Sequence, residues 1–189
     1  EALEEQKKNC AGMNVTFYDN FDDFIKHDMD AVVLANYANE HAPYAIKAMK
    51  AGKHVIVEKP IATSVADAKA MNKLAKQKKL SLTVDHMMVN NAWNVKAREI
   101  VAEQKLGTVN DCCFHMEFAY GYDPAEAATW RCSKIEEMGG PIGDVASHCI
   151  YMAEFVFNSK IKQVQAVYLP KTLPIKAEDG AYIKFTLEN

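Results

Sequence analysis

The chain has 189 residues, of which 49% are hydrophobic and 25% are charged, and these proportions are those of an ordinary globular protein. Its formal net charge of −3 provides no positive field that would attract nucleic acid or an anionic membrane, so neither partner is expected. No apolar stretch approaches the roughly 20 residues of a membrane span. The first residues also lack the apolar core of a signal peptide, and a cytoplasmic protein is therefore expected.

The number and spacing of the cysteines predict free thiols. Their number is odd and no Cys-x-x-Cys spacing occurs, so a disulfide framework or a structural metal site is not expected. We expect reduced and mostly buried side chains at Cys10, Cys112, Cys113, Cys132 and Cys149.

The first half of the chain alternates strands with helices. Strands are predicted at residues 31–35, 54–57 and 80–84, and the first is continuously apolar, as in a parallel strand covered on both faces. Helices are predicted over residues 42–51 and from 64 to about 79. Repeated β-α-β units of this kind indicate a parallel α/β sheet.

Two local signals support these helices. Pro43 stands early in the first helix and Gly52 follows its end, which is the usual order of these two residues at helix termini. Ser64 and Asp67 have the spacing of a capping box at the start of the second helix.

The second half has a different pattern. A helix over residues 93–106 ends at Gly107, and three segments with strand character follow. Residues 109–118 and 181–187 alternate apolar and polar side chains, and residues 163–169 are a further strand. With a helix over 144–157, these strands predict an open, mostly antiparallel sheet packed on helices.

The overall prediction is thus α/β followed by α+β, with a boundary near residue 107. Residues 1–107 would contain the parallel sheet, and residues 108–189 would form an α+β part with the open sheet.

Several motifs occur in a characteristic order along the chain. They are Asp30 to Asn36, Asn39-Glu40-His41, Ala51-Gly52-Lys53 through Glu58-Lys59-Pro60, Trp130-Arg131, and Gly139-Gly140-Pro141-Ile142-Gly143-Asp144 with His148 four residues later. Together they resemble the Gfo/Idh/MocA family of NAD(P)-dependent oxidoreductases. The resemblance implies NAD or NADP as cofactor and a sugar, polyol or related hydroxy compound as substrate. It also implies that residues 1–107 are a partial dinucleotide-binding domain with a Rossmann-type sheet, and that residues 108–189 are a partial α+β domain for substrate binding and oligomerisation.

The resemblance also indicates that the chain is an internal fragment. The family's N-terminal glycine-rich strand-turn-helix, which binds the dinucleotide pyrophosphate, has no counterpart here, and the family's C-terminal end is missing too. We therefore expect the fragment itself to be inactive and to bind cofactor weakly or not at all.

Three side chains are predicted to be catalytic and to contact substrate. His148 has the imidazole best suited to move a proton, and Asp144 lies one helical turn before it. Lys59 follows a strand at the edge where α/β proteins bind ligands, and its ammonium can polarise a substrate oxygen. Without the resemblance, Asp144 could be a residue that only stabilises a helix N-terminus and His148 a core histidine.

The resemblance places further residues around the cofactor and substrate. The expected cofactor contacts are Asn36, Asn39, His41, Glu58, Lys59, Pro60, Trp130 and Arg131. Tyr151 shares a helix face with His148 and could line the substrate site or belong to the core. Trp130 could equally be a core residue and Arg131 a surface ion-pair partner. The remaining histidines have no motif support and are expected to be structural: His27, His54, His86 and His115.

Three functions remain open from the sequence. The first is a dehydrogenase or reductase, and the second is an NAD-dependent glycosidase that uses hydride transfer transiently. The third is a cofactor-sensing regulator without net chemistry, because a fold does not fix a function. A homo-oligomer formed through the open sheet is expected in each case.

Overall fold

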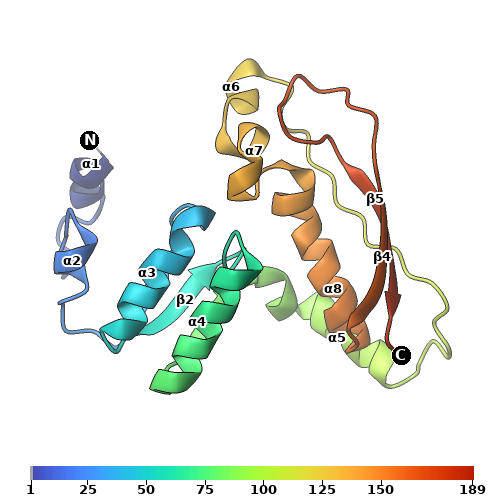
Figure 1. Ribbon diagram of the computed structural model, residues 1–189, viewed down its shortest axis with the longest axis horizontal. Helices are drawn as coiled ribbons and strands as arrows, with labels where there is room; N and C mark the ends of the chain where they lie inside the picture. The colour runs from blue at the N-terminus through green and yellow to red at the C-terminus, as the bar shows by residue number, and fades with distance from the viewer. Residues whose placement is uncertain (1) are drawn as a thin grey trace.

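The computed structural model describes residues 2–189. Its first part contains a parallel sheet with the strand order β1-β2-β3, of which Figure 1 labels the central strand, β2. The strands are β1 (Ala31–Leu34), β2 (His54–Glu58) and β3 (Leu82–Asp85). All three predicted strands and their parallel pairing are confirmed.

One face of this sheet is covered by two helices, α3 (Ala38–Lys50) and α4 (Val65–Lys78), which pack on each other and on the strands. Met49 of α3 and Met71 of α4 are completely buried against Val55 and Val57 of β2. The opposite face of the sheet is open, since Val33 is 66% exposed. The expectation that the first strand is covered on both faces is therefore wrong for the described residues. A continuous apolar run indicates that a strand can be buried on both faces, but it does not show whether other elements cover both faces.

Both helix starts have local explanations. The side chain of Ser64 accepts a hydrogen bond from the Asp67 amide at 3.0 Å, which confirms the capping box of α4. Helix α3 begins four residues earlier than predicted, so Pro43 lies inside it. Tyr37, the residue before the helix, makes no side-chain hydrogen bond that would mark the helix start in the sequence. The position of Pro43 was taken to mark that start, and it placed the start too late.

The second part of the chain is built around helix α8 (Ser147–Phe157), against which α5 (Ala92–Ala102) packs. A two-stranded antiparallel sheet follows, formed by β4 (Ile161–Tyr168) and β5 (Ala181–Leu187). The remaining elements are short: α1 (Ala2–Asn9), α2 (Phe21–Phe24), η1 (Met87–Asn90), α6 (Pro124–Ala127), α7 (Trp130–Ser133), η2 (Ile135–Glu137) and the π-helical η3 (Pro141–Ala146). The predicted α/β and α+β character of the two parts is confirmed.

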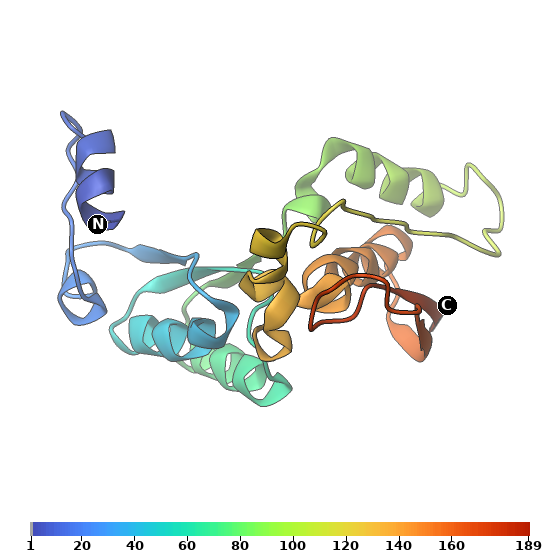
Figure 2. The ribbon, with the colours of Figure 1, turned by 90° about the horizontal axis from the view of Figure 1, so that it is seen from above.

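The predicted strand over residues 109–118 is wrong. This segment runs back past α8 as extended chain but pairs with no described strand (Figures 1 and 2). Alternation of apolar and polar residues favours a strand, but a strand also needs a hydrogen-bonded neighbour, and the pattern does not supply one. The predicted burial of the thiols is wrong for a related reason. Cys112 and Cys113 on this segment are exposed, and only Cys132 is fully buried.

Candidate active site

The site begins at the carboxyl edge of the parallel sheet. Glu58 at the end of β2 is in register with Asp85 at the end of β3, so the residues that follow both strands emerge side by side. Lys59 is the first residue after β2, and the bond between Lys59 and Pro60 is cis.

A buried histidine fastens the loop that follows Lys59. His41 of α3 is 1% exposed, and its two ring nitrogens lie 2.7 Å from the Pro60 carbonyl oxygen and 3.1 Å from the Asn36 carbonyl oxygen. The ring thus joins the loop after β1 to the loop after β2. His41 was predicted to contact cofactor, and the structure shows its polar atoms engaged with the backbone.

The glycines before Asp144 allow close approach of the chain. A Cβ atom on Gly143 would lie 2.5 Å from the Met138 carbonyl oxygen, and one on Gly140 would lie 2.6 Å from a carboxylate oxygen of Glu178. Gly140 also has a φ of +89°, which favours glycine. Glu178 accepts a hydrogen bond from the Ile142 amide and so satisfies a free N–H at the start of η3. The motif therefore fixes the direction in which Asp144 leaves the backbone.

Lys59 and Asp144 meet although they are 85 residues apart in the sequence. The Lys59 ammonium donates to the Asp144 carboxylate Oδ1 and to the Asp144 carbonyl oxygen, both at 2.6 Å. The second carboxylate oxygen, Oδ2, accepts a hydrogen bond from Nε of Arg131 at 3.1 Å. The Lys59 and Asp144 side chains are 18% and 19% exposed, so this ion pair is largely withdrawn from water. Asp144 is therefore held by two cations.

His148 lies one turn after Asp144, on α8. No hydrogen bond joins it to Asp144 within the described residues. Burial lowers the pKa of the His148 imidazole, the Lys59 ammonium lowers it further, and His86 adds to the effect. The nearby Asp144 carboxylate opposes these effects. The balance favours a neutral ring, which is the form that can accept a proton.

His86, which was expected to be structural, lies in the same cluster. Its ring centroid lies 4.8 Å from that of His148 and 4.7 Å from that of Tyr151. Burial and then the Lys59 ammonium lower the pKa of His86 as well. The sequence did contain a signal, because His86 follows β3 as Lys59 follows β2. Tyr151 faces His86 but is 45% exposed.

The other predicted residues are distributed around this edge. Asn36 follows β1, and its amide nitrogen donates to Glu40 at 3.1 Å. Asn39 is exposed on α3. The Glu58 carboxylate accepts a hydrogen bond from the Lys59 backbone amide at 3.3 Å. The Trp130 ring lies 4.6 Å from the Arg131 guanidinium, which places this pair beside Asp144. No group of three or more potential metal ligands occurs within residues 2–189.

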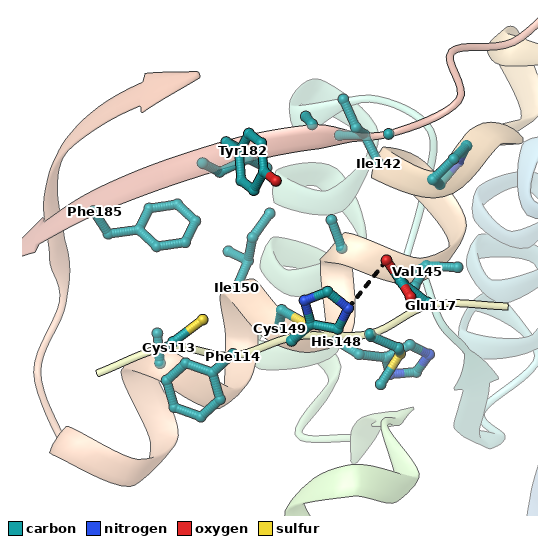
Figure 3. Close-up of a pocket in the computed structure, with 18 of the residues that line it drawn as sticks. Cys113, Phe114, Glu117, Ile142, Val145, His148, Cys149, Ile150, Tyr182 and Phe185 are labelled. Atoms are coloured by element: carbon teal, nitrogen blue, oxygen red, sulfur yellow. Dashed lines mark ion pairs between the residues drawn. The ribbon is translucent and has the colours of Figure 1, made fainter. Parts of the chain in front are cut away.

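A cavity of about 2650 Å³ opens beside these residues, and Lys59, Asp144 and His148 are among the residues that line it. Figure 3 shows its walls: Cys149 and Ile150 from α8, Phe185 from β5, and the extended segment with Cys113 and Phe114. The dashed line marks the ion pair between His115 and Glu117. Small-ligand pockets measure about 300–1,000 Å³. Only the part around the three polar side chains is therefore taken as the candidate active site.

Comparisons with known proteins show the family to which the chain belongs. Residues 1–86 match the oxidoreductase family with an NAD-binding Rossmann fold, and residues 94–189 match the Gfo/Idh/MocA C-terminal domain. The class is thus that of NAD-binding oxidoreductases, which confirms the predicted type of cofactor. The chain belongs to the Gfo/Idh/MocA family, as the sequence motifs predicted.

Similar sequences include sugar-acting enzymes. The chain is 30% identical over 141 residues to 1,5-anhydro-D-fructose reductase of Ensifer adhaerens, a match that covers 74% of this chain and 41% of the relative. It is 29% identical over 150 residues to levoglucosan dehydrogenase of Pseudarthrobacter phenanthrenivorans, covering 76% and 37%. The chain therefore spans well under half the length of these relatives.

Similar solved structures show the same fold. An NAD-binding protein from Listeria innocua matches with a TM-score of 0.81 and 25% identity, covering 98% of this chain and 54% of the other. The WlbA dehydrogenase from Bordetella pertussis, solved with NADH and UDP-GlcNAcA, matches with a TM-score of 0.79 and 24% identity, covering 98% and 57%. No described helix of the present chain is long and apolar enough to cross a membrane.

Proposed function

We propose that the complete natural protein is an NAD(P)-dependent dehydrogenase or reductase that acts on a hydroxyl group of a sugar, polyol or related compound. The observation that carries the proposal is the bond between Lys59 and Asp144. It joins the carboxyl end of β2 to η3, directly before the helix that bears His148, so that an ammonium, a carboxylate and an imidazole line the same cavity. The division into a dinucleotide-binding part up to residue 107 and a substrate part after it belongs to the same proposal.

The residues at the sheet edge fit a bound dinucleotide. Oδ1 of Asn36 is buried and has no hydrogen-bond partner within the described residues, although it lies where α/β proteins bind ligands. A ribose hydroxyl or a carboxamide could satisfy it. We assign the cofactor to this edge, with Asn36, Glu58, Pro60, Trp130 and Arg131 as contacts and Asn39 and His41 shaping the surrounding backbone. When bound, NAD(P) accepts or supplies the hydride.

Lys59 supplies positive charge where an alkoxide develops. A lysine ammonium has three N–H donors, and two of them bind Asp144. The third remains for the substrate oxygen. Asp144 fixes the ammonium in place and partly balances its charge, so that the group is oriented before substrate arrives.

His148 acts as the base in oxidation and as the acid in reduction. Its neutral form takes the hydroxyl proton as the hydride leaves the adjacent carbon, and the imidazolium returns the proton in the reverse direction. Because burial and Lys59 lower the pKa of the ring, the base form is available at neutral pH. Tyr151 is proposed to border the substrate site from the next turn of α8.

Turnover with a panel of monosaccharides, inositols and polyols tests this function, with NAD(P)H absorbance as the readout. Reduction or oxidation of at least one compound is expected. Release of an aglycone without net cofactor consumption would identify a glycosidase, and cofactor binding without turnover would identify a regulator; either result contradicts the proposal.

Replacement of the proposed base tests the role of His148. His148→Ala should lower kcat by about 10²–10⁴-fold, the usual value of general acid-base catalysis, and leave cofactor affinity nearly unchanged. His27→Ala is the matched control, because His27 contacts Tyr18 far from the sheet edge. Full turnover in His148→Ala would refute the assignment.

We also propose that a second copy of the chain covers the open face of the β4–β5 sheet. Val167 and Tyr182 are directly opposite each other in the register and are 67% and 74% exposed. Paired apolar side chains at this exposure favour association. Light scattering should give a mass above that of one chain, and Val167→Glu should lower it; a monomeric wild type would contradict the proposal.

A further inference from the structure

The acid-base role proposed for His148 requires one defined tautomer. A neutral imidazole carries one N–H, and the hydrogen bond made by one ring nitrogen decides which form the other presents. In many hydrolases a carboxylate performs this task. Here no hydrogen bond joins Asp144 to His148 within the described residues, and the side-chain bonds of its carboxylate go to Lys59 and Arg131. A different neighbour of the ring is therefore the candidate for orienting it.

His86 is the polar side chain whose ring packs directly on that of His148. The parallel register brings it there, since Asp85 is paired with Glu58 and the next residues on the two strands are His86 and Lys59. The two ring centroids are 4.8 Å apart and the ring planes are inclined by 56°. His86 does not line the cavity, so it stands behind His148 rather than beside the substrate.

The unpaired atoms in this cluster are complementary. Nδ1 of His148 and both ring nitrogens of His86 are buried without a hydrogen-bond partner in the part of the chain that the structure describes. A buried polar atom left unsatisfied typically costs about 1–3 kcal/mol. The two rings form no hydrogen bond as they stand, and a bond between one nitrogen of each requires a rotation about a terminal torsion, which is soft in histidine. Such a bond satisfies two of the three atoms at once.

We propose that His86 is a positioning residue that accepts a hydrogen bond from Nδ1–H of His148 and thereby leaves Nε2 of His148 as the atom that exchanges a proton with substrate. In oxidation, Nε2 takes the hydroxyl proton and the ring becomes an imidazolium that still donates from Nδ1. In reduction the proton leaves Nε2 again, and His86 changes neither charge nor partner. The inference rests on the proposed function only for the use made of Nε2.

Two further observations favour His86 as the acceptor. Burial and Lys59 lower the pKa of His86, which favours a neutral ring with one free lone pair. The backbone of His86 itself, that of Ser147 and the Asp85 carboxylate act in the opposite direction on the same pKa. Neither ring nitrogen of His86 has a hydrogen-bond partner among the described residues, so one of them is free to accept from His148.

The tautomer can be measured directly, without turnover. Two-bond ¹H–¹⁵N correlation spectra of the wild-type protein at pH 7.5 should show His148 protonated at Nδ1. A His148 signal protonated at Nε2, or an equal mixture of both forms, would overturn the inference. This measurement is independent of substrate, so it stands even if the complete protein turns over nothing and the proposed function fails.

Variants at position 86 then separate positioning from packing. His86→Phe keeps a ring but removes the acceptor, and it should abolish the preference for Nδ1–H and lower kcat by about 10–100-fold, by analogy with metal-binding histidines that lose the partner fixing their tautomer. KM should stay within about two-fold, because His86 does not touch substrate.

The amide variants provide the rescue. The side-chain oxygen of His86→Asn takes the place of Nδ1, and that of His86→Gln takes the place of Nε2, so one of the two should restore both the tautomer and most of kcat. An unchanged tautomer in His86→Phe, or equal losses in all three variants, would show that His86 only fills space.

Discussion

Neutralisation of Asp144 should destabilise the protein measurably. Asp144→Asn removes the negative charge that Lys59 and Arg131 share, and it leaves an ammonium whose side chain is only 18% exposed. Removal of one partner from a buried ion pair costs about 3–5 kcal/mol, whereas exposed pairs contribute about 0–1 kcal/mol. Because one fifth of each side chain reaches water and Lys59 keeps its bond to the Asp144 carbonyl, we expect a loss of about 2–3 kcal/mol in the free energy of unfolding.

Urea denaturation followed by circular dichroism measures this loss as a lower midpoint at an unchanged m value. Glu99→Gln is the matched control, because it neutralises the carboxylate of the exposed ion pair with Lys96 and should leave the midpoint unchanged. If Asp144→Asn shifted the midpoint no more than Glu99→Gln does, the bond between Lys59 and Asp144 would have no structural role, and the reasoning from its burial would be refuted.

Two further predictions follow from contacts in this part of the fold. Lys59→Ala removes a positive charge that lowers the pKa of His148, so that pKa should rise. In a plot of kcat/KM for oxidation against pH, the fall in activity at low pH should therefore begin at a higher pH than in the wild type. A fall that begins at the same or a lower pH would contradict the electrostatic coupling. Ser64→Ala removes the cap of α4 and should cost about 1 kcal/mol in urea denaturation, whereas Ser64→Asp should retain most of the stability; equal losses would show that the hydrogen bond to the Asp67 amide is not the cause.

The parallel part of the fold could be predicted because each signal is local. The apolar strand before Lys59, the Ser64 cap and the glycine at position 52 depend on neighbours within one or two turns. The segment 109–118 could not be predicted in the same way. Its alternation describes a face to be buried, whereas its pairing depends on which other strand lies alongside, and β5 pairs with β4 alone.

The candidate site, like the fold, could be predicted only in part. Lys59, Asp144 and His148 could be proposed from motif order, and the structure brings Lys59 and Asp144 into contact and His148 to the same cavity. The partner of Asp144 was not predictable by the same means, since the helical spacing suggested His148 and the structure shows two cations. His86 was missed because it belongs to no motif, and only the register of β2 and β3 reveals its position.

The contacts of His41 give the loop that carries Lys59 two ways of being held. A neutral imidazole has one N–H, so it can donate to only one of the two carbonyl oxygens, those of Asn36 and Pro60, at a time. A change of tautomer therefore transfers the hydrogen bond from the loop after β1 to the loop after β2. The four methylene groups of the lysine side chain give the ammonium further freedom of movement on either backbone arrangement.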